Sequence, residues 1–275
     1  MSNLEPEPVV NEPALVIDRT LVLADLHLGV EFELSLSGIN IPSQIDRRIT
    51  RALHLLHSTK AERVILLGDI KHTISKISKL EREDVPRFLR ALAELVEVDI
   101  IPGNHDAGLE YLIPRDARFN VELHPSKGCR VADIGLMHGH TWPSSELLSC
   151  KYVIIGHNHP AIRLVDPLGY ASSEPAWIRT RFVLDVFKKR YEDLACWANP
   201  VIIIMPAFNE LAGGIAFNEA SYDTLVGPLF ASKAIMLEQA QAYLLDGTYL
   251  GTIEQLARLT SRYRRRKRSS RRRTR

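Results

Sequence analysis

The stretch Ile101-Pro102-Gly103-Asn104-His105-Asp106 places three polar side chains directly after a strand-like run at residues 97–101. Asn104 offers a neutral oxygen ligand, and the imidazole of His105 can bind a metal ion or transfer a proton. A carboxylate such as Asp106 can fix which ring nitrogen of His105 carries the proton. Alone, the pattern is equally typical of a polar turn after a strand. It indicates a chemical site only if other strand ends also supply ligands.

Four other apolar runs, which we predict to be strands, lie at residues 20–24, 63–67, 134–137 and 152–155. The residues that follow them are, in chain order, Asp25-x-His27, Gly68-Asp69, His138-Gly139-His140 and Gly156-His157-x-His159. In an extended segment, residues two apart project to the same side, so each x-spaced pair can bind one ion. Because sites in α/β folds form at the carboxyl ends of strands, we expect these side chains to converge.

The segments between the strands indicate how the chain is organised. Apolar periodicity predicts helices at residues 43–57 and 81–96, and residues 29–42 are predicted to be a loop. Short strands dominate the second half, including one expected at residues 179–186, and a last helix is expected at residues 252–263. The residues alone therefore indicate an alternating α/β half followed by a strand-rich half.

The candidate ligands are Asp, His and Asn, without Cys. Such a set suits manganese, iron, zinc or magnesium and argues against a thiolate site. Seven side chains are too many for one tetrahedral ion, but they suit two ions that share a carboxylate. Asp69 is the natural bridge, because it is the lone acid after its strand. Two ions about 3.5–4 Å apart can clamp a phosphoester and activate a water.

The ordered set D-x-H, G-D, G-N-H-D, H and G-H-x-H, from Asp25 to His159, resembles the signature of the calcineurin-like metallophosphoesterase superfamily. This resemblance implies an α/β fold, a four-layer α/β/β/α sandwich with mixed sheets. The sequences at residues 24–29, 68–72 and 156–162 look like the archaeal-type branch related to the SbcD nuclease subunit, which suggests DNA repair.

The resemblance also implies a role for each matching residue. Asp25, His27 and His159 would hold one metal, and Asp69 would bridge it to the second. The remaining ligands of the second metal would be Asn104, His138 and His157. The nucleophile would be a metal-activated hydroxide, with manganese the favoured metal. His105 would give a proton to the leaving oxygen or stabilise its charge, and Asp106 would orient His105.

Three further polar residues lie beside these motifs. His72 and His140 are adjacent to candidate ligands, and we expect them to support the ligands rather than contact the substrate. Lys71 could meet a phosphate, although we expect it to be a surface lysine.

Composition sets limits on the rest of the chain. It has 275 residues, 45% of them hydrophobic, and no apolar run approaches the roughly 20 residues of a membrane span. Residues 1–13 are acidic and rich in proline and lack the pattern of a signal peptide, so we expect a disordered leader. The three cysteines are odd in number and widely spaced, which favours buried thiols in a reducing cytoplasm over a disulfide framework or a zinc knuckle. We expect one metallophosphoesterase domain at residues 14–261.

The charge is concentrated at the C-terminal end. The chain holds 35 basic and 33 acidic side chains, and ten of the basic ones lie in residues 262–275, which leaves residues 1–261 with a net charge of −8. We expect this tail to be disordered and to attract a nucleic-acid backbone by releasing counterions. The alternative is a solubilising tail without a partner. By analogy alone, a helicase or ATPase partner and a homodimer are also expected.

The sequence leaves three candidate functions open. The first is a metal-dependent phosphodiesterase that acts on DNA or RNA, and thus a nuclease-like enzyme. The second is a small-molecule or nucleotide phosphoesterase with the same metals. The third is a non-catalytic scaffold on the same fold, which is disfavoured because Asn104, His105 and Asp106 are all present.

Overall fold

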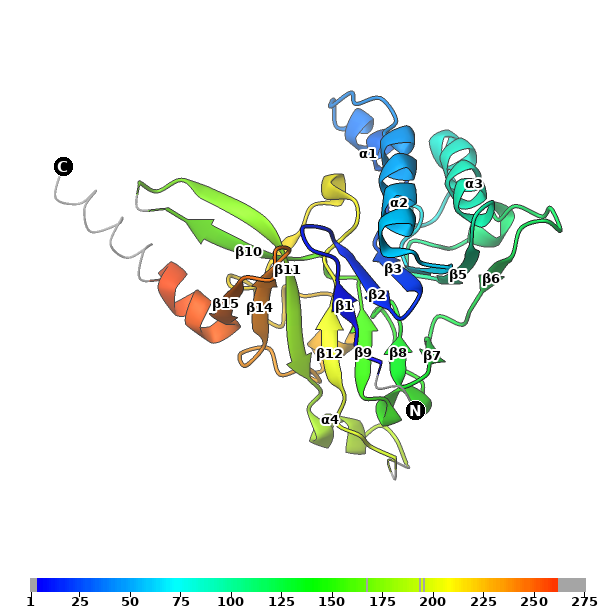
Figure 1. The fold of residues 1–275 in the computed structure, drawn as a ribbon. Helices are drawn as coiled ribbons and strands as arrows, with labels where there is room; N and C mark the ends of the chain where they lie inside the picture. Colours follow the sequence, from blue (N-terminus) through cyan, green and yellow to red (C-terminus); the bar gives the residue numbers. More distant parts are fainter. Residues whose placement is uncertain (1–3, 167, 193, 195, 262–275) are drawn as a thin grey trace.

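The computed structural model of the chain describes residues 4–261 apart from residues 167, 193 and 195. Two mixed β-sheets lie against each other, and helices lie on the outer faces (Figure 1). The predicted four-layer α/β/β/α sandwich is therefore confirmed. No helix within the described ranges is long and apolar enough to cross a membrane.

The first sheet carries the alternating α/β half of the chain. Its strands, in spatial order, are β1 (Glu7–Pro8), β2 (Ala14–Ile17), β3 (Thr20–Ala24), β4 (Arg63–Leu67), β5 (Glu97–Ile101) and β6 (Val121–Leu123). Strands β3 to β6 are parallel to one another, whereas β1 and β2 are antiparallel to their neighbours. Because parallel strands end at the same edge, the loops after β3, β4 and β5 lie together.

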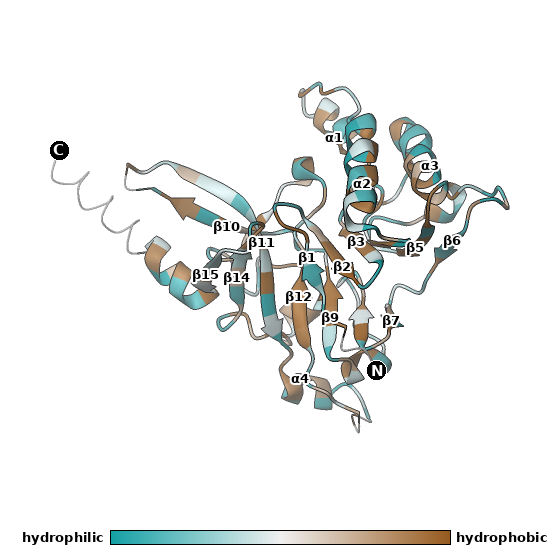
Figure 2. Ribbon diagram, in the orientation of Figure 1, coloured by the Kyte–Doolittle hydropathy of each residue, from teal (hydrophilic) through white to brown (hydrophobic). Residues whose placement is uncertain are grey.

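Two long helices cover the outer face of this sheet, α2 (Ile45–Thr59) and α3 (Lys79–Ala93), close to their predicted positions. Helix α3 begins earlier than predicted because Ser78 and Glu81 form a capping box around its first turn. The short helix α1 (Val30–Leu36) lies where we predicted a loop. Both long helices show mixed hydrophilic and hydrophobic colours, as expected for helices with one apolar face (Figure 2).

The second sheet has its main strands in the order β13 (Ile215–Ala216), β10 (Pro160–Val165), β11 (Ala171–Arg181), β12 (Val201–Ile204), β9 (Tyr152–Ile155), β8 (Ile134–Leu136) and β7 (Cys129–Val131). Strand β14 (Gln241–Leu244) pairs with β11 and with β15 (Tyr249–Thr252). The other elements are η1 (Leu109–Tyr111), η2 (Ser145–Ser149), α4 (Leu184–Lys188), η3 (Glu210–Ala212), α5 (Pro228–Ala231) and a helical stretch at residues 253–261.

Three apolar cores separate the four layers. One lies between the first sheet and helices α2 and α3, and one lies between the two sheets. The third lies between the second sheet and the elements that cover its other face, including α4 and α5. Alternate residues of β4 divide between the first two cores, with Val64 and Leu66 facing the helices and Ile65 and Leu67 facing the second sheet.

Besides the loop expected at residues 29–42, two further predictions about local structure were wrong. Residues 4–13 are not a disordered leader, because Glu7 and Pro8 pair with β2 and Glu5 accepts hydrogen bonds from Lys151 and Tyr152. The strand expected at residues 179–186 instead spans Ala171–Arg181, and α4 follows it. Residues 1–3, the basic tail at residues 262–275 and the end of the predicted last helix lie outside the described residues.

Candidate metal centre

The predicted ligands come from the strand ends of both sheets. Asp25 follows β3, Asp69 follows β4 and Asn104 follows β5 in the first sheet, while His138 and His157 follow the parallel strands β8 and β9 in the second. Residue His159 lies immediately before β10. The structure brings all seven together at the edge where the two sheets meet.

The first group contains the nitrogen and oxygen atoms of Asp25, His27, Asp69 and His159, all within 4.8 Å of one another. The Nε2 atoms of His27 and His159 are 3.1 Å apart. Nε2 of His159 lies 3.4 Å from Oδ1 of Asp25, and Nε2 of His27 lies 3.6 Å from Oδ2 of Asp69. These four residues form the predicted ligand set of one ion.

The second group contains Asp69, His138 and His157, again within 4.8 Å of one another. Nε2 of His138 lies 3.3 Å from Oδ2 of Asp69 and 3.3 Å from Oδ1 of Asn104. The carboxylate of Asp69 therefore faces both groups, which is the position expected of a bridging ligand.

The chemistry of these groups fits divalent metal ions. The ring nitrogens and carboxylate oxygens of both groups face one another at short distances, with the Nε2 atoms of His27 and His159 3.1 Å apart. A cation between them would use the lone pairs that face inward. The set of imidazoles, carboxylates and one amide contains no thiolate, so it suits manganese, iron, zinc or magnesium.

The backbone is strained where these ligands lie. Asp25, His27, Asp69, His157 and His159 all have positive φ angles, between 40° and 73°. Such conformations are uncommon for residues other than glycine, and they gather at functional sites, where the surrounding structure maintains them. In this chain, the strained positions coincide with five of the seven predicted ligands.

The glycines of the motifs allow the carboxylate ligands to lie against the backbone of neighbouring loops. A Cβ atom on Gly103 would lie 2.1 Å from Oδ1 of Asp69, and one on Gly156 would lie 2.7 Å from Oδ2 of Asp25. Any larger residue at either position would displace a carboxylate. The G-N-H-D and G-H-x-H sequences thus carry a packing requirement as well as the ligands themselves.

Burial and charge set the protonation of the ligands. Burial lowers the pKa of His27 to about 2, and burial with the neighbouring His138 lowers the pKa of His157 to about 3, so both rings are neutral, as metal ligands must be. Burial opposes a charge on His138, but the carboxylates of Asp69 and Asp25 outweigh it and raise its pKa to about 9. Burial also works against an ionised Asp69, yet His138 and His27 hold the pKa of Asp69 well below its ordinary range.

His105 lies beside Asp69, with its Nε2 atom 3.9 Å from Oδ2 of that residue. Its Nδ1 atom makes a hydrogen bond to the backbone carbonyl of His72. Because a carbonyl only accepts, Nδ1 carries a proton and donates it. The Nε2 atom is therefore the ring position available for chemistry in the site.

The prediction that Asp106 orients His105 directly was wrong. The buried carboxylate of Asp106 instead accepts hydrogen bonds from the backbone N–H groups of Ile70 (2.8 Å), Lys71 (3.1 Å) and Gly103 (2.8 Å). It joins the loop after β4 to the loop after β5. Burial and the nearby Asp69 raise the pKa of Asp106 to about 6.

The three side chains beside the motifs, Lys71, His72 and His140, differ in their contacts. Lys71 is not a surface residue, since it is fully buried and its ammonium group donates to the carbonyl of Thr73. His72 faces His27 rather than a carboxylate of either group. The ring of His140 lies 5.3 Å from that of His138, and its buried Nδ1 atom has no hydrogen-bond partner among the described residues.

Two further supporting residues come from elements that the motifs do not include. The carboxylate of Glu81 on α3 accepts a hydrogen bond of 2.9 Å from the backbone N–H of His72. The amide of Asn209 donates to the backbone carbonyls of Leu26 (2.8 Å) and His27 (3.2 Å). The capping box of Glu81 is visible in the sequence, but no local signal links Asn209 to residues 26 and 27.

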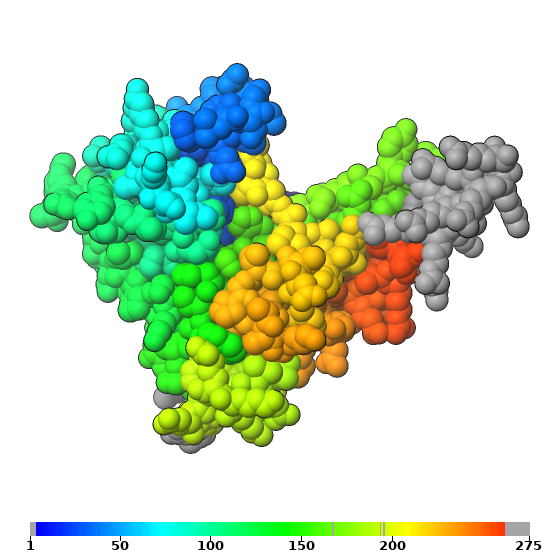
Figure 3. Space-filling view, turned by 180° about the vertical axis from the view of Figure 1, so that it is seen from behind, coloured from blue at the N-terminus to red at the C-terminus, as the bar shows by residue number. Residues whose placement is uncertain are grey.

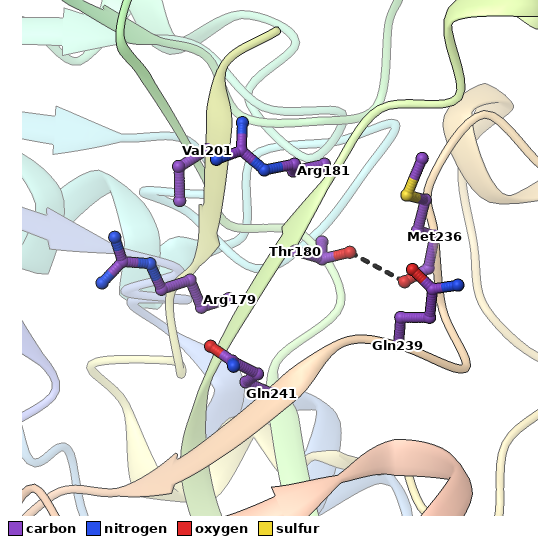
Figure 4. Close-up of a pocket in the computed structure, with 7 residues that line it drawn as sticks. All are labelled: Arg179, Thr180, Arg181, Val201, Met236, Gln239 and Gln241. Atoms are coloured by element: carbon purple, nitrogen blue, oxygen red, sulfur yellow. Dashed lines mark hydrogen bonds between the residues drawn. The ribbon is translucent and has the colours of Figure 1, made fainter.

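The cavities of the described structure differ in their relation to this centre. One of about 350 Å³ is lined partly by His159, Pro160, Ala161 and Phe208, and thus adjoins a predicted ligand. Another, of about 380 Å³, lies on β11, β12 and β14 and contains no predicted ligand; its lining residues are shown in Figure 4. Seen from behind, the surface is also hollowed between α1 and the segment around residue 210 (Figure 3).

Comparisons with known proteins bear on the family and the fold of this chain. A family model described as calcineurin-like phosphoesterase matches residues 18–197. Among solved structures, the Pseudomonas putida nuclease MPE is 19% identical, with a TM-score of 0.51 over 89% of this chain and 98% of that one. Yfce, a phosphoesterase from E. coli, is 17% identical, with a TM-score of 0.33 over 54% of this chain and 73% of that one.

No curated protein sequence matches the chain. The family match nevertheless covers more than half of its residues and includes every predicted ligand. The match, the four-layer fold and the convergent donor groups lead to one conclusion: this chain belongs to the calcineurin-like phosphoesterase family and is a metal-dependent phosphoesterase.

Proposed function

We propose that this phosphoesterase uses two metal ions to hydrolyse phosphodiester bonds of DNA or RNA. The observation that carries the two-metal proposal is the position of Asp69, whose carboxylate faces His27 of one group and His138 of the other. The two groups share no other residue. A shared carboxylate is the arrangement by which two neighbouring ions can act on one phosphate.

Each group would hold one ion. The ligands of the first would be Asp25, His27, Asp69 and His159, and those of the second would be Asp69, Asn104, His138 and His157. When bound, the ions would lower the pKa of a water and offset the negative charge of the phosphate. Manganese is our proposal for the native metal, with iron, zinc and magnesium as the alternatives that the same ligands can bind.

His105 would act as the general acid. Its Nδ1 proton is held by the carbonyl of His72, which fixes the ring and directs Nε2 toward the site. When the ring is cationic, Nε2 carries a second proton and can give it to the leaving oxygen. Asp106 would contribute by fixing the two loops that carry Asp69 and His105.

Two features favour a nucleic-acid substrate. The basic residues 262–275 would attract a phosphate backbone to a chain whose other residues are acidic overall. The structural neighbour from Pseudomonas putida is a nuclease. We also propose a role in DNA repair, which the resemblance to the SbcD-related branch suggests, and a location in the cytoplasm. A helicase or ATPase partner and a second copy of the chain are further proposals.

A panel of single-stranded and double-stranded DNA and RNA, each with manganese, magnesium, zinc or iron, tests this function. We expect cleavage of at least one polymer by the wild-type chain and none by Asp69→Ala. Hydrolysis of a small phosphodiester without cleavage of any polymer would contradict the nucleic-acid proposal.

A small-molecule or nucleotide phosphoesterase is the second candidate. The cavity of about 350 Å³ beside His159 favours it, because that volume lies within the range of small-ligand sites. Deleting residues 262–275 separates the two candidates. Loss of polymer affinity with retained hydrolysis of a small ester supports a nuclease guided by its tail, whereas unchanged polymer affinity would contradict the role of the tail.

A further inference from the structure

A row of three side chains leads from the first metal group to the surface. The Nδ1 atom of His27 lies 3.2 Å from Nδ1 of His72, and Nε2 of His72 lies 2.6 Å from Oε2 of Glu33. The exposed fraction of the side chain rises along the row, from 4% for His27 to 15% for His72 and 64% for Glu33. Glu33 lies on α1, which borders the hollow seen in Figure 3.

The donors and acceptors in this row can be assigned in order. The carboxylate of Glu33 only accepts, so Nε2 of His72 carries a proton and donates it. A neutral His72 then has a lone pair on Nδ1, which accepts a hydrogen bond from the Nδ1–H of His27. This leaves the lone pair of His27 on Nε2, the atom that faces Asp69 and His159.

We infer that Glu33 and His72 are positioning residues, which fix the tautomer and the orientation of His27 so that its Nε2 atom can bind a metal ion. The inference rests on the proposed function only in that His27 must be a ligand. A metal-binding histidine commonly donates its other ring N–H to such a partner, and loss of the partner weakens metal binding.

The row is held from several sides. The backbone N–H of His72 donates to the carbonyl of Leu28 (3.1 Å) and to Glu81 (2.9 Å), so His72 cannot move far from the end of β3. The backbone carbonyl of His72 also accepts the Nδ1–H of His105. His72 therefore connects the orientation of the ligand His27 with that of His105.

The same atoms allow an alternative interpretation, in which they bind a third metal ion. Nitrogen atoms of His27, His72 and His105 lie within 4.8 Å of one another and could form a separate ligand group. However, Nδ1 of His105 donates to a carbonyl and Nε2 of His72 donates to Glu33, so a third ion would need Nδ1 of His72. That atom is the acceptor of the hydrogen bond from His27 in the positioning role. The positioning role predicts two ions per chain, whereas the alternative predicts three.

Titration calorimetry of the full chain with manganese chloride tests the inference. His72→Phe retains a ring but removes both nitrogens, and we expect the affinity of one of the two sites to fall about 10–100-fold. His72→Asn keeps an oxygen acceptor near the position of Nδ1 and should restore most of that loss. Glu33→Ala should cause a smaller loss at the same site, and Glu83→Ala, which removes an exposed carboxylate on α3, should cause none.

Each outcome has a definite meaning. Unchanged affinity in both His72→Phe and Glu33→Ala would overturn the inference while leaving the two-metal function intact. Equal losses in His72→Phe and His72→Asn would show a packing role instead of an acceptor role, and three ions in the wild type would favour the third site. If the wild type binds no metal, both the proposed function and this inference are wrong.

Discussion

Asp69 is the residue on which most of the chemistry depends. Its side chain is 3% exposed, and it lies within 3.9 Å of ring nitrogens from His27, His105 and His138. One of its oxygens also accepts the backbone N–H of His105 at 2.9 Å. A single carboxylate thus contacts both candidate metal groups and His105, the proposed general acid.

His105 gives the sharpest prediction for a single side chain. Replacing it with Ala should lower the turnover about 10²–10⁴-fold, the usual contribution of a general acid. The affinity for manganese should stay near that of the wild type, because His105 is not a proposed ligand. Steady-state kinetics on a small phosphodiester, combined with calorimetry, measures both quantities.

The control is His54→Ala, since His54 is exposed on α2 and lies outside the proposed machinery. It should leave turnover and metal affinity unchanged. If turnover were also unchanged in His105→Ala, His105 would not be the general acid.

Residue patterns predicted which side chains converge, because each predicted ligand lies close to a strand end. Asp25, Asp69 and His157 follow their strands by one or two residues. A glycine directly precedes Asp69 and another directly precedes His157. The partners of these ligands could not be predicted in the same way. Glu33 and Asn209 reach the site from elements whose position is fixed only by tertiary packing.

At the level of elements, the parallel strands of the first sheet are joined by a buried charge cluster. Asp99 on β5 accepts hydrogen bonds from Arg63 on β4 and from His124 just after β6, the latter with a distance of 2.6 Å. Burial would raise the pKa of Asp99, but Arg63 and His124 outweigh it and lower the pKa below 3.8.

This lowered pKa predicts how the stability depends on pH. Ionised Asp99 stabilises the folded chain above its unfolded pKa of 3.8, and this contribution is lost as the pH falls through the lower folded pKa. Asp99→Asn should therefore unfold more easily than the wild type at pH 7, and the difference should shrink below about pH 4. Urea unfolding at pH 7 and at several acidic values measures it.

The matched control is Glu83→Gln, which removes an exposed carboxylate on α3. Its stability should follow that of the wild type at every pH. A difference between Asp99→Asn and the wild type that grew toward low pH would contradict the assigned role of Asp99.

Helices and strands could be predicted where a long apolar periodicity or a continuous apolar run marks them in the sequence. Helix α2 has fifteen residues and a clear apolar stripe, whereas α1 has only seven and was missed. Strand β11 was misplaced because its first five residues, Ala171–Pro175, are polar or exposed and belong to a projecting hairpin with β10 (Figure 1). Hydrogen bonding to β10, rather than burial, makes them a strand.

At the scale of the whole molecule, the two sheets meet at an apolar core and at the candidate metal centre. That core joins residues such as Ile65 and Leu67 of β4 to Ile154 and Ile203 of the second sheet. At the carboxyl ends of these strands the apolar contacts give way to the metal groups. Ions bound there would connect the sheets where the core does not.

Metal binding should therefore stabilise the whole fold. At a manganese concentration about 100-fold above its Kd, binding at one site adds about 2.7 kcal/mol to the free energy of unfolding. This gain corresponds to a rise in Tm of about 5–10 °C. Differential scanning calorimetry with manganese and with a chelator measures the shift. Asp69→Ala should show a much smaller shift, and an equal shift in that variant would place the bound metal elsewhere.

The central claim is that two ions lie on either side of Asp69. Anomalous X-ray diffraction from crystals grown with manganese tests it most directly. We predict two peaks about 3.5–4 Å apart, one beside His27 and His159 and the other beside His138 and His157, with Asp69 touching both. A single peak, or peaks away from Asp69, would contradict the claim.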